Sequence, residues 1–362
     1  MKKIKPTSWL KNIPAYVPGT SKDAIMERYG ISDPIKLASN ENPLGPSPKA
    51  LQALDRFKES SHLYPDPTAA DLRKAAAVFF GCPPERIIAG NGSDEIIDLI
   101  CRAFIEPGDE VIIPECTFSY YRIASLACGA RPIASGMKGQ AIDAEDILKQ
   151  LSGKTKIVFV ANPNNPTGTY LTKAEIMHLA AKVPKNTLLV VDEAYAAFVR
   201  HSDFISAADL INDHEHVAVI HTLSKSHGLA GLRLGFGIAH EQVIENLYRI
   251  KPPFNVNLLA LKAGEAALYD KAFLQQTLEN TWKGLDYLYT EADRLGLEYV
   301  PSQTNFVLIR IGADAQRVYE ELLKKGIITR SMASYGLDNF IRVSIGLPRE
   351  NRAFINHLEE IL

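Results

Sequence analysis

The stretch Leu188-Leu189-Val190-Val191-Asp192-Glu193-Ala194-Tyr195 places four apolar residues directly before two carboxylates and a tyrosine. A run this short and this apolar is typical of a strand that is buried on both faces of a parallel sheet. Helical patterns separate it from similar runs, so we expect an α/β fold with a mostly parallel central sheet. The other runs are Ile87-Ile88-Ala89, Val111-Ile112-Ile113, Ile157-Val158-Phe159-Val160, Val217-Ala218-Val219-Ile220 and Leu234-Gly235-Phe236-Gly237.

The chain follows different patterns on either side of this region. The opening stretch, to about Pro48, is rich in Pro, Gly and Ser and predicts an irregular arm. After about Pro252 a long helical region runs to Leu295, and a smaller α+β unit is expected beyond it, with strands near 305–309 and 340–345, a helix near 314–325 and a last helix. We therefore expect an N-terminal arm (1–48), a large domain (49–250) and a small C-terminal domain (251–362).

Two predicted helices have recognisable starts. Ser93 is expected to cap a helix whose apolar residues follow at helical spacing. Thr172-Lys173-Ala174-Glu175 has the form of a capping box before another helix. Nearly all polar motifs of the chain lie at the carboxyl ends of predicted strands, which is where open α/β sheets bind ligands.

Composition and charge argue against several classes of function. The 362 residues are 46% hydrophobic and 23% charged with a net charge of −2, so we expect no nucleic-acid or membrane binding. No apolar run approaches the length of a membrane span, and the basic start is not followed by the apolar segment of a secretory signal. We therefore expect a cytoplasmic protein whose four cysteines are reduced thiols.

Two charged residues follow strands of the predicted sheet. Lys225, in Thr222-Leu223-Ser224-Lys225, could form a Schiff base, although a solvated strand exit would look the same. Asp192 needs a cationic partner if it is buried, and a protonated pyridine nitrogen would be one. A metal-linked Asp of a nucleotide site and a helix cap are alternatives, but position 148 is Leu148, where a phosphate loop would need glycine.

Three further motifs each fit a structural and a functional interpretation. Asn162-Pro163-Asn164-Asn165-Pro166-Thr167-Gly168 fits a pair of turns or a rigidly presented amide. Gly90-Asn91-Gly92-Ser93-Asp94-Glu95 fits an ordinary cap or an anion site at a helix N-terminus. Arg233, in Gly231-Leu232-Arg233-Leu234-Gly235, fits a surface arginine or a guanidinium that binds a phosphate through two parallel hydrogen bonds.

Asp213-His214-Glu215-His216 contains the residue types of a metal site. Histidines two positions apart do not share a helix face, and the stretch precedes a predicted strand. We interpret it as a solvated loop and expect no metal site in this protein.

In their order along the chain, these motifs resemble the fold-type I pyridoxal-phosphate (PLP)-dependent aminotransferases of class I/II. The series is Asn-Pro-Thr-Gly, Asp-x-x-Tyr, Ser-Lys and Gly-x-Arg-x-Gly, and the resemblance extends over essentially the whole chain. Within the family, the similarity is greatest to the histidinol-phosphate aminotransferases. It rests on Leu37-Ala38-Ser39-Asn40-Glu41-Asn42-Pro43-Leu44-Gly45, Leu63-Tyr64-Pro65, the Gly90–Glu95 motif and Arg342-Val343-Ser344-Ile345-Gly346.

The resemblance implies a large PLP-binding domain and assigns roles to residues at the strand ends. Lys225 would bind PLP as a Schiff base and later move the proton between Cα and C4′ of the cofactor. Asp192 would pair with the pyridine nitrogen, and Tyr195 and Asn165 would hydrogen-bond the ring O3′. Phe118 would stack on the ring, where the family often has Tyr. The phosphate would be bound by Ser93, Asp94, Thr222, Ser224 and Arg233, and by Tyr64 of the partner subunit.

The resemblance also implies a homodimer and two small-molecule substrates. L-glutamate would donate its amino group and leave as 2-oxoglutarate, and imidazole acetol phosphate would accept it and leave as L-histidinol phosphate, in histidine biosynthesis. Arg342 would bind the substrate α-carboxylate, Tyr16 and Arg330 the substrate phosphate, and Asn165 would lie beside the substrate.

Rival functions share many of these features. An aromatic or broad-specificity aminotransferase would use the same cofactor residues. A PLP-dependent threonine-phosphate decarboxylase would also bind a phosphorylated amine. A regulator built on the same fold would carry an N-terminal DNA-binding domain, for which the early motifs leave no room.

Overall fold

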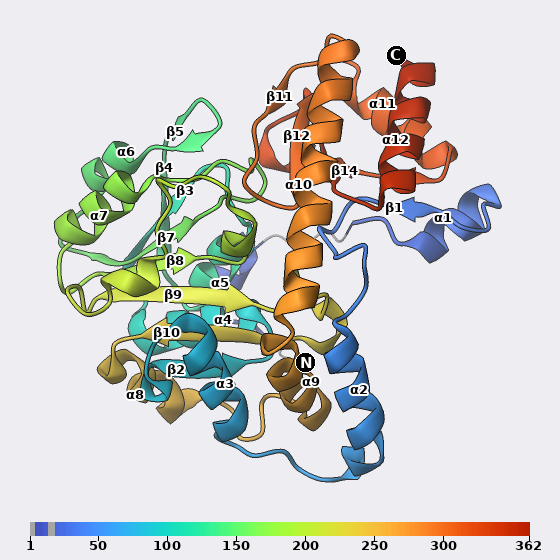
Figure 1. Cartoon of the computed structure of the whole chain (residues 1–362). Helices are drawn as coiled ribbons and strands as arrows, with labels where there is room; N and C mark the ends of the chain where they lie inside the picture. The colour runs from blue at the N-terminus through green and yellow to red at the C-terminus, as the bar shows by residue number, and fades with distance from the viewer. Residues whose placement is uncertain (1–3, 14–18) are drawn as a thin grey trace.

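The computed structural model describes residues 4–13 and 19–362, and its largest element is a seven-stranded sheet (Figure 1). The strand order is β2-β10-β9-β8-β7-β3-β4. Neighbouring strands run parallel, except that β10 is antiparallel to β2 and β9. The predicted mostly parallel sheet is confirmed. Its strands are β2 (Ile87–Gly90), β3 (Glu110–Pro114), β4 (Arg131–Ser135), β7 (Thr155–Ala161), β8 (Leu188–Asp192), β9 (Val217–Thr222) and β10 (Gly235–Ala239).

The sheet is covered on both faces because alternate residues of its strands enter two hydrophobic cores. In β7, Val158 and Val160 lie in one core and Ile157 and Phe159 in the other. The first core is completed by α2 (Pro48–Phe57), α3 (Ala70–Phe80), α6 (Ala144–Lys149), α7 (Lys173–Lys182) and α9 (Leu258–Leu268). The second is completed by α4 (Ser93–Phe104), α5 (Tyr120–Ala127) and α8 (Glu241–Ile250). The capping box predicted at Thr172 is confirmed at the start of α7.

A four-stranded antiparallel sheet lies in the C-terminal part, with the order β11-β12-β15-β14. Its strands are β11 (Tyr299–Val300), β12 (Phe306–Arg310), β14 (Arg330–Ser331) and β15 (Phe340–Ser344). Three helices share a hydrophobic core with it: α10 (Lys271–Arg294), α11 (Ala315–Lys324) and α12 (Pro348–Ile361). In Figure 1, α10 runs between this sheet and the large one, so a single helix spans both parts of the molecule.

The N-terminal arm is more regular than predicted. It contains α1 (Lys22–Tyr29) and β1 (Ile35–Lys36), and β1 pairs in parallel with β13 (Ile327–Ile328). The Ser21 hydroxyl caps the start of α1, and Gly30 ends it with a φ of 68°. The expectation of an irregular arm is therefore wrong for this segment. The division into an arm, a large domain and a small domain remains a prediction.

Short elements join these units. A hairpin of β5 (Met137–Lys138) and β6 (Ala141–Ile142) follows β4. The 3-10 helices are η1 (Ser8–Asn12), η2 (Lys58–His62), η3 (Pro84–Arg86), η4 (Ala196–Phe198), η5 (Ala207–Leu210), η6 (Ala230–Leu232) and η7 (Ala333–Tyr335). Among them, η4 has a positional role because it follows the polar end of β8.

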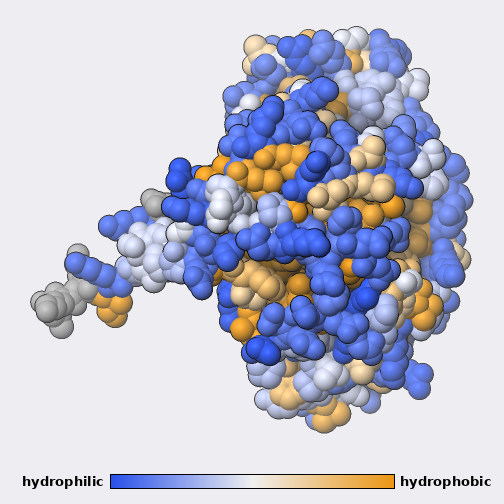
Figure 2. Space-filling view, turned by 90° about the vertical axis from the view of Figure 1, so that its left-hand side faces the viewer, coloured by the Kyte–Doolittle hydropathy of each residue, from blue (hydrophilic) through white to orange (hydrophobic). Residues whose placement is uncertain are grey.

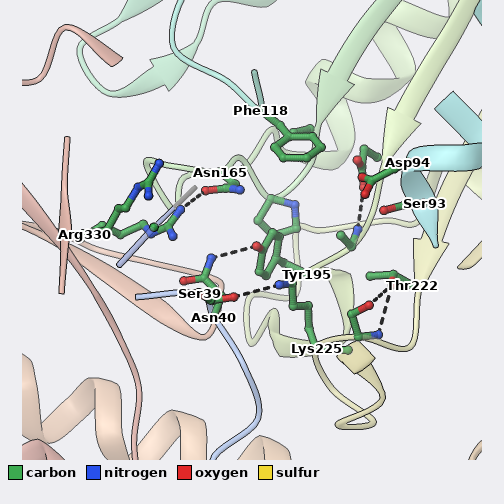
Figure 3. Close-up of a pocket in the computed structure, with 18 of the residues that line it drawn as sticks. Ser39, Asn40, Ser93, Asp94, Phe118, Asn165, Tyr195, Thr222, Lys225 and Arg330 are labelled. Atoms are coloured by element: carbon green, nitrogen blue, oxygen red, sulfur yellow. Dashed lines mark hydrogen bonds between the residues drawn. The ribbon is translucent and has the colours of Figure 1, made fainter. Parts of the chain in front are cut away.

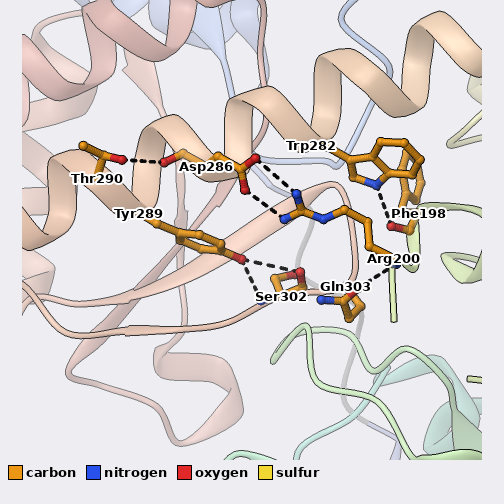
Figure 4. A network of polar contacts seen from close by, with 8 residues as sticks. All are labelled: Phe198, Arg200, Trp282, Asp286, Tyr289, Thr290, Ser302 and Gln303. Atoms are coloured by element: carbon orange, nitrogen blue, oxygen red, sulfur yellow. Dashed lines mark hydrogen bonds and ion pairs between the residues drawn. The ribbon is translucent and has the colours of Figure 1, made fainter. Parts of the chain in front are cut away.

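A polar network fastens the chain after β8 to α10 and to the segment before β12 (Figure 4). The guanidinium of Arg200 donates to both carboxylate oxygens of Asp286 on α10, at 3.1 and 2.9 Å. The backbone N–H of Arg200 donates to Oε1 of Gln303 at 2.9 Å, and Trp282 Nε1 donates to the Phe198 carbonyl oxygen at 2.8 Å. The chain after β8 is therefore linked to α10 and to the segment that leads into β12 of the smaller sheet.

The surface face shown in Figure 2 carries apolar patches that are separated by hydrophilic side chains. None of the helices within the described ranges combines the length and the apolarity needed to cross a membrane.

Candidate active site

A cavity of about 240 Å³ lies at the carboxyl ends of β7, β8 and β9, where open α/β sheets bind ligands (Figure 3). Residues of β14 and β15 line its other side. Of the predicted site residues that the structure describes, all except Tyr64 line this cavity. They are Ser93, Asp94, Phe118, Asn165, Asp192, Tyr195, Thr222, Ser224, Lys225, Arg233, Arg330 and Arg342.

Lys225 follows β9, and its Nζ donates to the Ser39 carbonyl oxygen at 3.1 Å. Burial is the main cause of a pKa lowered to about 8. The nearby guanidinium of Arg342 lowers this pKa more than that of Arg233 does. About a tenth of the amine is therefore neutral at pH 7, far more than for an ordinary lysine, and a nucleophile or base requires this neutral form.

Asp192 ends β8 and is 6% exposed. The Tyr121 hydroxyl donates to Oδ2 at 2.7 Å, and the Ala194 N–H donates to Oδ1 at 3.0 Å. Burial raises the pKa of Asp192 to about 6, although both hydrogen bonds lower it. A buried carboxylate is costly without a cationic partner, so this position favours a positively charged ligand atom.

The N-terminus of α4 and the turn after β9 form an end of the cavity that suits an anion. Gly92 is the N-cap of α4 and Ser93 its first residue, so the prediction that Ser93 caps the helix is wrong. No side chain caps this helix, which leaves its first backbone N–H groups to a ligand. The hydroxyls of Thr222 and Ser224 lie 2.9 Å apart at the same end.

Arg233 completes the anion-binding end. Its backbone has a φ of 56°, and its guanidinium pairs with Oδ2 of Asp94 at 3.0 Å. A Cβ atom on Gly92 would lie 2.6 Å from this guanidinium, and one on Gly235 would lie 2.5 Å from the backbone nitrogen of Ser93. Glycine at these two positions therefore lets β10, the helix start and the guanidinium approach closely.

Two guanidiniums lie at the opposite end of the cavity. Arg330 on β14 and Arg342 on β15 are direct partners in an antiparallel pair, so their side chains leave the same face. Arg342 donates to Oδ1 of Asn165 and, at 2.8 Å, to the Ala38 carbonyl oxygen. Figure 3 shows Arg330 across the cavity from the start of α4, so the cavity has a positive region at each end.

Tyr195 is held by a residue to which the sequence analysis gave no role. The Tyr195 hydroxyl accepts a hydrogen bond from Nδ2 of Asn40 at 2.9 Å. Asn40 is 2% exposed, accepts from the Ser344 hydroxyl at 2.8 Å and has a φ of 55°. Asparagine is one of the residues that adopt this backbone conformation most readily, which was a signal for Asn40 in the sequence.

The aromatic wall of the cavity also includes a residue that was missed. Phe118 lies across the cavity from Lys225 (Figure 3), as its predicted stacking role requires. Tyr121, three positions later, lines the cavity and packs its ring edge-to-face against Phe118, with centroids 5.5 Å apart. Its position at the start of a helix after a strand end was the signal in the sequence.

Residues 32–358 match the model of the family described as aminotransferase class I and II. The chain belongs to this aminotransferase family. It is 41% identical to a histidinol-phosphate aminotransferase from Moorella thermoacetica, over 97% of this chain and 91% of the relative. It is 42% identical to one from Bdellovibrio bacteriovorus, over 99% of this chain and 98% of the relative.

A solved structure agrees with the aminotransferase fold over nearly the whole chain. The histidinol-phosphate aminotransferase of Sinorhizobium meliloti, in complex with pyridoxal-5'-phosphate, gives a TM-score of 0.91 at 26% identity. The alignment covers 99% of this chain and 98% of that one. The predicted fold and reaction class are confirmed.

One described residue that was predicted to serve the aminotransferase site, Tyr64, lies elsewhere in this subunit. Tyr64 is 82% exposed and stacks on Phe254, with ring centroids 4.7 Å apart. It lines a different, smaller cavity, and its predicted action on a partner subunit remains a prediction. Tyr16 lies outside the described residues.

The stretch Asp213-His214-Glu215-His216, which contains the residue types of a metal site, is less exposed to solvent than predicted. His216 is buried, at 8% exposed, and its ring lies edge-to-face with that of His214, so the expectation of a solvated stretch is wrong for His216. In the part of the chain that the structure describes, no three His, Cys, Asp or Glu residues are grouped so that they could hold a metal ion.

Proposed function

We propose that this aminotransferase exchanges an amino group between L-histidinol phosphate and 2-oxoglutarate, with PLP as its cofactor. Relatives with 41% and 42% identity over nearly the whole chain carry the name histidinol-phosphate aminotransferase, which supports the substrate. The related enzyme of Sinorhizobium meliloti binds pyridoxal-5'-phosphate, which supports the cofactor.

The residues of the cavity fit PLP. The α4 N-terminus, Thr222, Ser224 and Arg233 would hold its phosphate, Asp192 its pyridine nitrogen, and Tyr195 and Asn165 its ring oxygen. Gly92 and Gly235 let the helix start, β10 and the Arg233 guanidinium lie close enough together to bind one phosphate. When bound, PLP supplies an electron sink for the charge that develops at the substrate Cα.

Lys225 would hold and move the proton of the reaction. Because its pKa is lowered to about 8, the neutral amine is available to take the proton from Cα of the substrate. The resulting ammonium would deliver that proton to the C4′ position. Asp192, as a carboxylate, would keep the ring nitrogen cationic during this transfer.

The cross-strand pair of Arg330 and Arg342 is the observation that carries the choice of substrate. Two guanidiniums on one face of neighbouring strands repel each other, and an anion between them relieves this repulsion. L-histidinol phosphate has a phosphate ester in place of an amino-acid carboxylate. Its dianion suits two guanidiniums, each able to donate parallel hydrogen bonds. In the other half-reaction, the α-carboxylate of 2-oxoglutarate or glutamate would bind Arg342.

Replacing Arg330 tests this choice. We expect Arg330→Ala to lower kcat/KM for L-histidinol phosphate by roughly ten- to a hundredfold, as for a lost hydrogen bond to a charged group, and to affect L-phenylalanine little. Arg310→Ala is the matched control, because Arg310 lies on the same sheet but pairs with Glu298 at 3.1 Å outside the cavity. Steady-state rates on both substrates provide the measurement.

The rival functions predict different results in this assay and in a second one with threonine phosphate. Equal losses on both substrates in Arg330→Ala would favour an aromatic or broad-specificity aminotransferase. Release of carbon dioxide from threonine phosphate, without consumption of 2-oxoglutarate, would identify the decarboxylase. Either result would overturn the assignment to histidinol phosphate.

A homodimer is part of the proposal. Tyr64 and Phe254 form a stacked aromatic pair that is 82% and 40% exposed, and Phe254 has a φ of 54°. Large exposed aromatic side chains are enriched where proteins associate. We infer that this pair faces the partner subunit and that Tyr64 reaches the partner's cofactor phosphate.

A cytoplasmic location is also proposed. The four cysteines are free thiols, as is usual for proteins of a reducing compartment. Biosynthesis of an amino acid from phosphorylated intermediates fits that compartment.

A further inference from the structure

Tyr121 lies in the first turn of α5 and is fully buried. Its ring stacks on Phe159 of β7, with centroids 4.7 Å apart and an interplanar angle of 3°. Its edge meets the ring of Phe118, the aromatic wall of the cavity, at an interplanar angle of 86°. Two aromatic neighbours on different elements therefore fix the direction of the Tyr121 hydroxyl.

That hydroxyl points at the carboxylate of Asp192. It donates to Oδ2 at 2.7 Å, while the Ala194 N–H donates to Oδ1 at 3.0 Å. Each carboxylate oxygen is thus held by one donor and has a further lone pair for a second. The plane of the carboxylate is set before a ligand arrives, which lowers the cost of ordering it on binding.

The same hydrogen bond acts on the charge of Asp192. Burial favours the neutral acid, and the Tyr121 hydroxyl opposes burial by stabilising the carboxylate. His221 on β9 also lowers the pKa of Asp192, and Asp94 on α4 raises it. A neutral acid would give a pyridinium nitrogen no countercharge, so loss of the hydroxyl weakens both the orientation and the charge of Asp192.

We propose that Tyr121 is a positioning residue that holds Asp192 oriented and ionised toward the cofactor's ring nitrogen. This inference rests on the proposed use of PLP. Tyr121 acts through Asp192, so its removal changes cofactor binding and not the reactive groups themselves.

The test compares Tyr121→Phe with Tyr120→Phe in the full-length chain. The control is closely matched, because the adjacent Tyr120 hydroxyl donates to Oδ2 of Asp98 at 2.9 Å, outside the cavity. We expect Tyr121→Phe to weaken PLP binding by roughly ten- to a hundredfold, as for a lost hydrogen bond to a charged group. Tyr120→Phe is expected to bind PLP as the wild type does.

Two further measurements keep the inference separate from the proposed function. Carbon-13 NMR titration of the chain without PLP should give a higher pKa for Asp192 in Tyr121→Phe than in the wild type and Tyr120→Phe. This readout involves no cofactor. In an Asp192→Asn background, Tyr121→Phe should weaken PLP binding no further, because the carboxylate charge that the Tyr121 hydroxyl stabilises is already absent.

Several outcomes would overturn the inference. Wild-type PLP affinity in Tyr121→Phe, an unchanged titration of Asp192, or additive losses with Asp192→Asn would each show that Tyr121 serves only packing. If the wild-type chain itself failed to bind PLP, the proposed function would fail, while the titration would still report whether Tyr121 sets the charge of Asp192. Because Phe keeps both ring contacts, Tyr121→Phe is expected to fold as the wild type does, and melting curves check this.

Discussion

Burial moves the pKa values of Asp192 and Lys225 toward neutrality from opposite directions, to about 6 and about 8. Near neutral pH, each group in the chain without cofactor is therefore less completely ionised than its ordinary pKa would make it. A cationic ring nitrogen would give Asp192 the countercharge that its surroundings lack. Buried charge lowers the stability of the chain without PLP. The same buried groups favour the binding of PLP, which supplies the opposite charge.

The cost of Asp192 predicts a pH-dependent gain in stability for Asp192→Asn. A carboxyl group whose pKa rises from 3.8 to about 6 on folding binds more protons folded than unfolded between these values. Stability is therefore lost as the pH rises through this window, and the penalty is complete above it. At pH 8 the variant without PLP should be more stable by up to about 3 kcal/mol.

Denaturant unfolding of the PLP-free chains at pH 8 and pH 4.5 measures this difference. Asn is a suitable replacement because its amide can donate to the Tyr121 hydroxyl and accept from the Ala194 N–H. The stability advantage should shrink at pH 4.5. An equal advantage at both pH values would contradict the assigned cause.

At the residue scale, sequence reasoning located the groups whose type defines the chemistry. Lys225, Asp192 and Arg233 stand in ordered motifs at strand ends, and all three line the cavity. Asn40 and Tyr121 received no role because their importance lies in contacts with residues far along the chain. Asn40 binds Tyr195, 155 positions away, and Tyr121 binds Asp192, 71 positions away.

At the scale of elements, the anion-binding end depends on how closely β10 approaches the start of α4. A Cβ on Gly235 would lie 2.5 Å from the backbone nitrogen of Ser93 and 2.6 Å from the carbonyl carbon of Gly92. Backbone atoms cannot rotate away as a flexible side chain can. The helix start and the strand must therefore separate if this glycine is replaced.

Gly235→Ala is expected to weaken PLP binding at least about tenfold and to destabilise the chain by about 1–3 kcal/mol, the usual cost of overpacking. Gly231→Ala, in the same motif, is the control because a Cβ there meets no atom within 4 Å. Fluorescence titration with PLP and thermal melting are the measurements. Equal behaviour of the two variants would show that close approach of β10 does not shape this end.

The sequence predicted best those elements that are marked by a clear local pattern. Six of the seven strands of the large sheet, all except β4, and α7 were located because short apolar runs and a capping box mark them. Helix α1 was missed because only one of its side chains is buried, so no apolar stripe identifies it. The cap of α4 was placed one residue late because Gly92 carries no side-chain signal.

At the scale of the whole molecule, the cavity is assembled from distant parts of the chain. Ala38, Ser39 and Asn40 of the arm line it together with strand ends of the large sheet and with Arg330 and Arg342 of the C-terminal sheet. Arg342 and Asn165, which are hydrogen-bonded, are 177 positions apart. Such distances cannot be obtained from local pattern, so the resemblance to a family had to supply them.

The proposed homodimer predicts that mixed dimers regain activity. A Lys225→Ala subunit paired with a Tyr64→Ala subunit would contain one intact site, because the Tyr64→Ala subunit keeps Lys225 and receives Tyr64 from its partner. By two-fold symmetry the mixed dimer should reach about half of wild-type activity, whereas each mutant homodimer stays low. No recovery on mixing would mean that Tyr64 serves its own subunit or neither.

A single turnover with L-histidinol phosphate tests the central claim most directly. Wild-type enzyme loaded with PLP is mixed with stoichiometric L-histidinol phosphate, without any keto acid, and its absorbance spectrum is followed. We predict that the PLP absorbance is lost as pyridoxamine phosphate forms, that 2-oxoglutarate restores it, and that Lys225→Ala shows neither change at the wild-type rate. A spectrum that L-histidinol phosphate leaves unchanged, while L-phenylalanine converts the cofactor, would contradict the account.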